Sequence, residues 1–134
     1  MIIRKSASEI ETMARAGRVV ADTLALVAEH AQPGITTAEL DAVADEFIRA
    51  EGGIPTFKGY RGYPAATCLS PNGMVVHGIP GATKLTNGDI LSVDVGVTLD
   101  GFVADSAWTY AIGTISPEAQ RLLDVCEAAL EAGI

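Results

Sequence analysis

The sequence predicts an α+β fold in which helices pack on an antiparallel sheet. Two capping boxes, each a Ser or Thr followed three residues later by Glu, mark helix starts in the first part of the chain. Two turn signals farther on, Asn72-Gly73 and Asp100-Gly101, each lie between extended runs and predict β-hairpins. A further helix is predicted after Ser116, so helices should flank a region of paired strands.

The first helix is predicted to begin at Ser8, where Glu11 completes the capping box, and to end before Pro33. Apolar residues recur behind this cap at helical spacing. They predict a buried stripe made of Ile10, Met13, Ala14, Gly17, Val20, Ala21, Leu24 and Val27.

Two more helices follow from the same kind of signal. Thr36 with Glu39 predicts a helix that stops at Gly52-Gly53, and Ser116 caps the last one. Their expected apolar stripes are Leu40, Val43, Ala44 and Phe47 for the former, and Leu122, Val125, Cys126 and Ala129 for the latter.

The middle of the chain differs from the helical segments in its amino-acid composition. Residues 56–64 mix glycine, proline and aromatic residues and indicate an ordered loop. Residues 66–70 and 74–78 are expected to pair as one hairpin, and residues 90–98 and 102–111 as a second.

The second hairpin brings two carboxylates together. A two-residue loop at Asp100-Gly101 fixes the register, so Gly96 lies opposite Asp105. Asp94 and Asp105 then project from one face as diagonal neighbours, with Cα atoms roughly 7–8 Å apart. Two carboxylates at this spacing could converge on a pair of divalent ions about 3.5–4 Å apart.

A bound cation would explain why two aspartates share one face of the hairpin. Mid-strand aspartates are disfavoured and repel each other, and hard oxygen ligands suit manganese, magnesium, cobalt or iron. Gly96 and Ala107 are expected to leave open space beside the carboxylates. A solvated face that merely carries them is the alternative. The opposite face is expected to be core and holds Leu91, Val93, Val95, Val97, Phe102, Ala104 and Trp108.

His77 is the other candidate for chemistry. It ends an extended run, just before Gly78, where the chain must turn. Such a histidine could ligate a metal, donate a hydrogen bond to a developing oxyanion, or be structural.

Composition narrows the classes of function. The 134 residues suggest a single domain, 1–134, and the net charge of −8 with a pI near 4.5 argues against nucleic-acid binding. No apolar run approaches the roughly 18–20 residues of a membrane span, and the opening residues do not resemble a signal peptide. We therefore expect a cytoplasmic protein in which Cys68 and Cys126 are free thiols.

Several motifs run along the chain in a fixed order. They are Glu9-Ile10-Glu11, Ala16-Gly17-Arg18, Gly59-Tyr60-Arg61-Gly62-Tyr63-Pro64, Val76-His77-Gly78-Ile79-Pro80, Gly88-Asp89-Ile90, Val93-Asp94-Val95, Asp100-Gly101-Phe102 and Asp105. Together they resemble the amino-terminal half of a type I methionine aminopeptidase. The sequence departs from that family at Val103-Ala104, where many members have histidine and glycine, and neither position is a ligand.

The resemblance implies the "pita-bread" fold, two related α+β halves around a curved antiparallel sheet, of which residues 1–134 would be an incomplete amino-terminal half. It also implies a metalloaminopeptidase that removes the initiator methionine from nascent proteins whose second residue is small. Its expected partners are nascent peptide N-termini at the ribosome, and the complete protein is expected to be a cytoplasmic monomer.

The resemblance further assigns roles to residues. Asp94 would chelate one of two divalent metal ions (cobalt, manganese, iron, zinc or magnesium) and Asp105 would bridge both. His77 would be catalytic and bind the substrate near the scissile amide, and the methionine side chain would lie against Phe57, Tyr60, Tyr63 and Cys68. The family's remaining ligands, one histidine and two glutamates, belong to its second half, so we expect this chain alone to be inactive.

Two other functions remain open. A non-catalytic pita-bread module could bind a partner through an exposed half-interface, although it would not need Asp94, Asp105 and His77 together. A proline-specific dipeptidase relative of the same fold usually carries a long extra amino-terminal domain, whereas the first helix predicted here begins at once.

Overall fold

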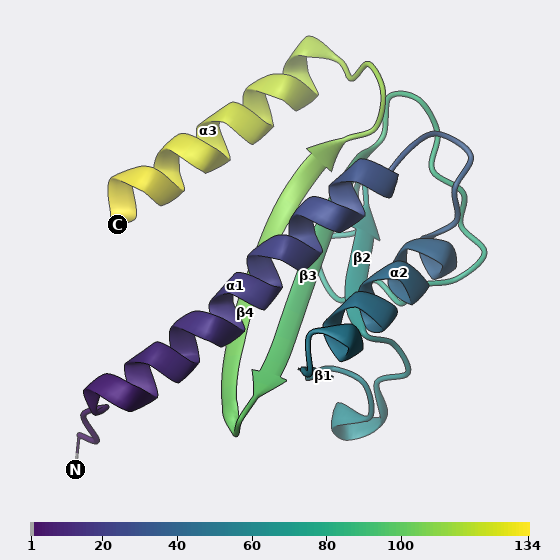
Figure 1. Ribbon diagram of the computed structural model, residues 1–134. Helices are drawn as coiled ribbons and strands as arrows, with labels where there is room; N and C mark the ends of the chain where they lie inside the picture. Colours follow the sequence, from purple (N-terminus) through teal and green to yellow (C-terminus); the bar gives the residue numbers. More distant parts are fainter. Residues whose placement is uncertain (1) are drawn as a thin grey trace.

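Helices cover an antiparallel sheet, as the sequence predicts (Figure 1). The structure is a computed structural model and describes residues 2–134. No helix in that range is long and apolar enough to cross a membrane. The elements in order are α1 (Ala7–His30), α2 (Thr37–Ala50), β1 (Ile54–Pro55), the 3₁₀ turn η1 (Tyr60–Gly62), β2 (Thr67–Pro71), β3 (Ile90–Leu99), β4 (Phe102–Ala111) and α3 (Pro117–Gly133).

Strand β3 is the centre of the sheet. β4 pairs with one of its edges, while β1 and β2 pair with successive stretches of the other, all antiparallel. The predicted hairpin register is confirmed, since Gly96 lies opposite Asp105 and Asp94 opposite Ala107. Both residues of the two-residue turn have positive φ, 49° and 83°, which suits the twist of a tight hairpin.

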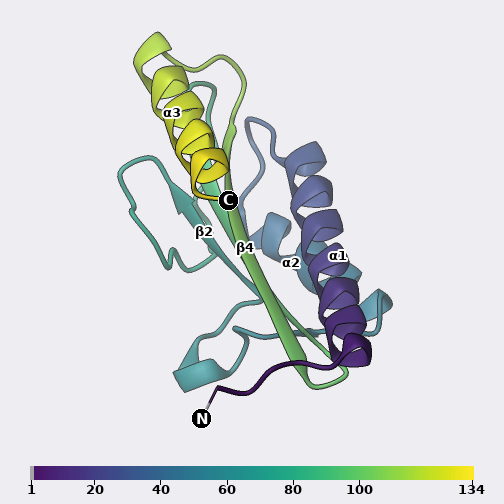
Figure 2. The same cartoon turned by 90° about the vertical axis from the view of Figure 1, so that its left-hand side faces the viewer.

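The core lies between the sheet and the first two helices. Helix α1 packs on β3, β4 and α2, and α2 packs against β1 and β2. Figure 2 shows α1 and α3 on opposite sides of the sheet. The fully buried apolar side chains include Val27, Leu40, Ala44, Ile48, Leu69, Leu91, Val93, Val95 and Val97.

Two expectations for α1 need correction. The helix is capped by Ser6 and Glu9, which form a capping box two residues earlier than the predicted pair. The Ser-x-x-Glu spacing occurs in both registers, and the earlier one adds half a turn of helix. The observed buried stripe is Ala16, Val19, Val20, Thr23, Leu24 and Val27. The predicted stripe is therefore wrong in its amino-terminal part and at Ala21, which is exposed.

The position of α1 on the sheet explains this difference. Figure 1 shows the first turns of α1 running out past the edge of β4, while Arg15 forms an ion pair of 3.2 Å with Asp100 in the β3–β4 turn. Ile10 and Met13, on these first turns, are 56% and 38% exposed.

The predicted hairpin between residues 66–70 and 74–78 is also wrong. β2 pairs with β3 instead, and the segment after it forms coil. Asn72 explains the change, because its amide donates to the Ile90 carbonyl and its side-chain oxygen accepts from the Ile90 amide. The Asn-Gly turn at the end of β2 is thus hydrogen-bonded to the start of β3 and does not form a hairpin with the segment that follows it.

The second helix and the last helix begin where predicted, at Thr36 and Ser116. α3 has no buried residue, and Trp108, expected in the core, is 38% exposed near the free edge of the sheet. The apolar stripe expected on α3 is therefore exposed, with Leu122 and Val125 among its residues.

Candidate functional site

A cavity of about 560 Å³ lies on the face of the sheet away from α1, between the hairpin and the loops that precede and follow β2. All the residues singled out in the sequence line it: Phe57, Tyr60, Tyr63, Cys68, His77, Asp94 and Asp105. Arg61, Gly62, Pro64 and Ile79 complete its wall. Residues from positions 57 to 105, over a third of the chain, are thus brought to one place.

The two aspartates differ in their surroundings. Asp105 is exposed on β4, whereas Asp94 is partly buried on β3 and its Oδ1 is buried without a hydrogen-bond partner. Burial raises the pKa of Asp94, the charge of Asp105 raises it further, and His77 lowers it. An unpaired buried carboxylate oxygen beside a second carboxylate is costly without a positive charge near it.

The donor set therefore fits a divalent cation. The orphaned Asp94 oxygen and the Asp105 carboxylate offer hard oxygen ligands that a cation would satisfy. Among residues 2–134 no group of three or more histidine, cysteine or carboxylate side chains could hold a metal ion. The two aspartates can supply only part of a full coordination shell.

Asp94→Asn is expected to raise the free energy of unfolding of the metal-free chain at neutral pH by about 1 kcal/mol. The pKa of Asp94 is higher in the folded chain than its ordinary value of 3.8. Its contribution to stability is therefore complete below that ordinary value and is lost as the pH rises through the folded value. The asparagine variant does not suffer this loss.

Urea denaturation in EDTA measures the effect. The gain from Asp94→Asn should be present at neutral pH and absent at about pH 3. A variant less stable than the wild type at neutral pH would contradict this description of Asp94.

Phe57 fills the space that was expected to be open at Gly96. A Cβ at Gly96 would stand 2.6 Å from the Phe57 ring, and the Thr56 amide donates to the Gly96 carbonyl at 2.9 Å. The glycine therefore lets the aromatic ring approach β3 closely beside the aspartates. The expectation of empty space at this position is wrong.

Tyr63 and Cys68 form the inner wall of the cavity. Cys68 is buried and lies directly opposite Asp94 in the β2–β3 pairing. Burial raises the pKa of the Cys68 thiol, so the wall is neutral and apolar on this side. Both cysteines are free thiols, as expected. Such a lining suits a flexible apolar side chain.

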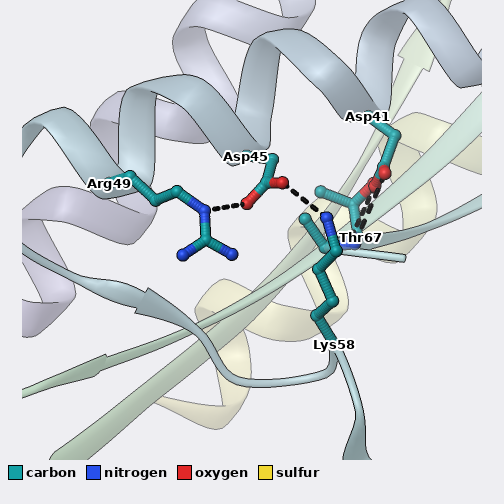
Figure 3. A network of polar contacts seen from close by, with 6 residues as sticks. Asp41, Asp45, Arg49, Lys58 and Thr67 are labelled. Atoms are coloured by element: carbon teal, nitrogen blue, oxygen red, sulfur yellow. Dashed lines mark hydrogen bonds and ion pairs between the residues drawn. The ribbon is translucent and has the colours of Figure 1, made fainter. Parts of the chain in front are cut away.

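Helix α2 holds both ends of the loop that carries the aromatic residues (Figure 3). Asp41 accepts hydrogen bonds from the Thr67 amide at 2.8 Å and the Thr67 hydroxyl at 2.7 Å. One turn later, Asp45 pairs with Lys58 at 2.6 Å and with Arg49 at 2.7 Å. Local sequence patterns did not reveal these supporting residues, because the bonds from α2 to the loop join positions 13 and 26 residues apart.

His77 lies in the coil after β2 and is itself exposed. Its φ of 58° is unusual for a residue other than glycine. It faces the same cavity as Asp94 and Asp105. Backbone strain of this kind often accompanies functional positions.

Comparisons with known proteins agree with this arrangement. A methionine aminopeptidase of Clostridium perfringens is 48% identical over all 134 residues, and methionine aminopeptidase 1 of Bacillus subtilis is also 48% identical over the whole chain. The crystal structure of methionine aminopeptidase from Rickettsia prowazekii superposes on the whole chain with a TM-score of 0.97 at 36% identity. The chain therefore has the expected fold, the amino-terminal half of the pita-bread arrangement.

The chain spans about half the length of these relatives, 54% in each case. The family model described as "Metallopeptidase family M24" matches residues 11–134, a range that contains every residue of the cavity wall. With the fold, the paired aspartates and this match in agreement, the chain belongs to metallopeptidase family M24.

Proposed function

We propose that this chain forms the amino-terminal half of a methionine aminopeptidase that removes the initiator methionine from nascent proteins whose second residue is small. The observation that carries the proposal is the single cavity in which Asp94 and Asp105 meet His77 and an apolar wall. The names and identities of the relatives support it. In the complete protein we place the activity in the cytoplasm, on a monomer that meets its substrates at or near the ribosome.

Each group has a role in this proposal. Asp94 and Asp105 would hold two divalent ions together with one histidine and two glutamates from the other half. When bound, the ions supply Lewis-acid chemistry, polarising the scissile carbonyl and making an attacking water reactive near neutral pH. The chain's own residues bind and orient the substrate around that chemistry.

The apolar wall would select the side chain that is removed. Phe57, Tyr63 and Cys68 form a slot for an unbranched thioether, and Tyr60, which is 63% exposed, lies at its rim. His77 would donate a hydrogen bond near the scissile amide as the bond breaks. In this proposal the chain contributes an apolar wall of the specificity pocket and two of the five metal-ligating side chains.

The test compares the 134-residue chain with a fusion that adds the part of the Clostridium perfringens relative that the chain lacks. The fusion is expected to release methionine from a Met-Ala peptide when a divalent metal is present, and the chain alone is expected not to, because two ligands make a weak, open site. Circular dichroism confirms that both are folded.

Two results would overturn the proposal. One is a folded fusion that remains inactive with manganese, cobalt, iron, zinc and magnesium. The other is clear metal-dependent turnover by the chain alone. A fusion that cleaves an Ala-Pro peptide in preference to Met-Ala would indicate the proline-specific function instead.

A further inference from the structure

The segment that carries His77 is not held by burial. Met74, Val75 and Val76 are all exposed, and so is His77 itself. The positive φ of His77, 58°, is nevertheless a conformation that a non-glycine residue keeps only when its surroundings impose it. The restraint must come from the residues next to it.

Gly78 supplies that restraint. It is buried, its amide donates to Ser70 Oγ at 3.0 Å, and its carbonyl accepts from the Leu69 amide at 2.9 Å. A Cβ at Gly78 would stand 2.2 Å from the Leu69 carbonyl oxygen. Only glycine can therefore lie this close to β2, with both backbone polar groups bonded.

A second hydroxyl reinforces the same contact. Tyr63 Oη lies 3.0 Å from both the Gly78 and the Thr67 carbonyl oxygens. Burial, followed by the neighbouring Cys68, raises the pKa of Tyr63, so the hydroxyl keeps the proton that it donates. Tyr63 thus ties the segment to the start of β2, while Ser70 ties it near the end.

The strand register relates this anchor to the two aspartates. Ser70 lies opposite Ser92, and Cys68 lies opposite Asp94, two residues farther along the same strand pair. Because alternate residues of a strand share a face, Ser70 and Asp94 project from the same side of the sheet. An anchor on Ser70 therefore fixes the position of the His77 segment on the face of the sheet that carries the aspartates.

We propose that Ser70 is a positioning residue whose buried hydroxyl, together with that of Tyr63, clamps Gly78 to β2 and so holds His77 over Asp94 and Asp105. The clamp itself follows from the contacts of Gly78, whereas the catalytic use of His77 rests on the proposed function. Ser70 is 4% exposed, and its hydroxyl oxygen accepts the hydrogen bond of the Gly78 amide. Loss of the Ser70 hydroxyl leaves the Gly78 amide without an acceptor. The exposed segment that carries His77 then detaches from β2, so that the amide can bond to water.

The test uses the ¹³C,¹⁵N-labelled 134-residue chain and the variants Ser70→Ala and Tyr63→Phe. Ser92→Ala is the matched control, because it removes the same hydroxyl from the residue directly opposite, and the hydroxyl of Ser92 accepts from the Thr109 hydroxyl on β4 rather than from Gly78. Three quantities are measured: the exchange rate of the Gly78 amide, the Cα shift of His77 that reports its positive φ, and the relaxation of the His77 ring protons by Mn²⁺.

In Ser70→Ala, Gly78 exchange is expected to be at least about tenfold faster, and the His77 Cα shift should move toward the value of a mobile coil. The Mn²⁺ relaxation of the His77 ring should fall by at least about half, since a local opening carries the ring away from the ion. Broadening of the Asp94 and Asp105 amides should not change. Tyr63→Phe should alter His77 in the same direction, and Ser92→Ala should alter neither residue.

Unchanged His77 signals in both variants would overturn the proposal, as would equal effects in Ser92→Ala, which would mean general loosening of the sheet. The failure of the proposed function looks different. Wild-type chain whose Asp94 and Asp105 amides do not respond to Mn²⁺ would contradict the metal site, while the Gly78 exchange rate and the His77 shift, which need no metal, would still decide the clamp.

Discussion

Asp105→Asn in the fusion protein is expected to lower the turnover of a Met-Ala peptide by at least about 10³-fold. Metal ions supply several kcal/mol of transition-state stabilisation, and about 4 kcal/mol corresponds to that factor. Asp105 is exposed on β4 beside Asp94, where an asparagine offers one neutral oxygen in place of a charged carboxylate. Steady-state kinetics at saturating Mn²⁺ measure the loss.

The matched control is Asp100→Asn in the turn of the same hairpin. Asp100 has a φ of 49°, which asparagine tolerates, and its ion pair with Arg15 is exposed. Turnover should change less than about twofold, because this pair contributes little and lies away from the cavity. An Asp105→Asn fusion that keeps more than about a tenth of its turnover would contradict the role of a metal ligand.

Asp41→Ala is expected to lower the free energy of unfolding of the chain by about 3 kcal/mol. The carboxylate accepts from the amide and the hydroxyl of Thr67, a residue with no exposed surface, and weakly from the Ala66 amide at 3.4 Å (Figure 3). Without it, two buried donors lose a charged acceptor where water does not reach them. Urea denaturation measures the loss.

Asp45→Ala provides the control for this effect, on the same helix and one turn away. Its partners Arg49 and Lys58 have side chains that are 53% and 43% exposed, so the expected loss is at most about 1 kcal/mol. If the two alanine variants were equally destabilised, the contrast between a buried and an exposed anchor would be wrong. Asp41→Ala should also loosen the start of β2 next to Cys68.

The elements that depend on local signals could be predicted. The β3–β4 register followed from the two-residue turn at Asp100-Gly101, because so short a loop leaves one pairing in which both strands keep their apolar face inward. The capping box at Thr36 is equally local and lies where the pattern placed it. The cap of α1 was ambiguous, since the same motif occurs twice within six residues, Ser6 to Glu11.

The elements that depend on distant partners could not be predicted. An Asn-Gly between two extended runs is typical of a hairpin, but Asn72 bonds to Ile90 and β2 joins β3 across an 18-residue separation. Likewise, nothing in the local pattern shows that Phe57 packs against Gly96. Such contacts depend on which strand pairs with the edge of β3 in the folded chain. The periodicity of the local sequence carries no information about that choice.

The candidate site likewise contains residues that the sequence could predict and residues that it could not. The chemical groups Asp94, Asp105 and His77 were visible in the sequence, and their shared cavity is a feature of the structure. The residues that support them, Asp41 and Ser70, could not be recognised in the sequence. Each acts by accepting hydrogen bonds from buried donors that only the fold brings to it.

The central claim is that Asp94 and Asp105 together bind a divalent metal. The most direct test is a Mn²⁺ titration of the ¹⁵N-labelled chain, followed through the paramagnetic broadening of its backbone amides. Broadening should begin at Asp94, Asp105 and their strand neighbours and should vanish from these positions in both Asp94→Asn and Asp105→Asn. Broadening that starts elsewhere, or that persists at the hairpin in either variant, would contradict the claim.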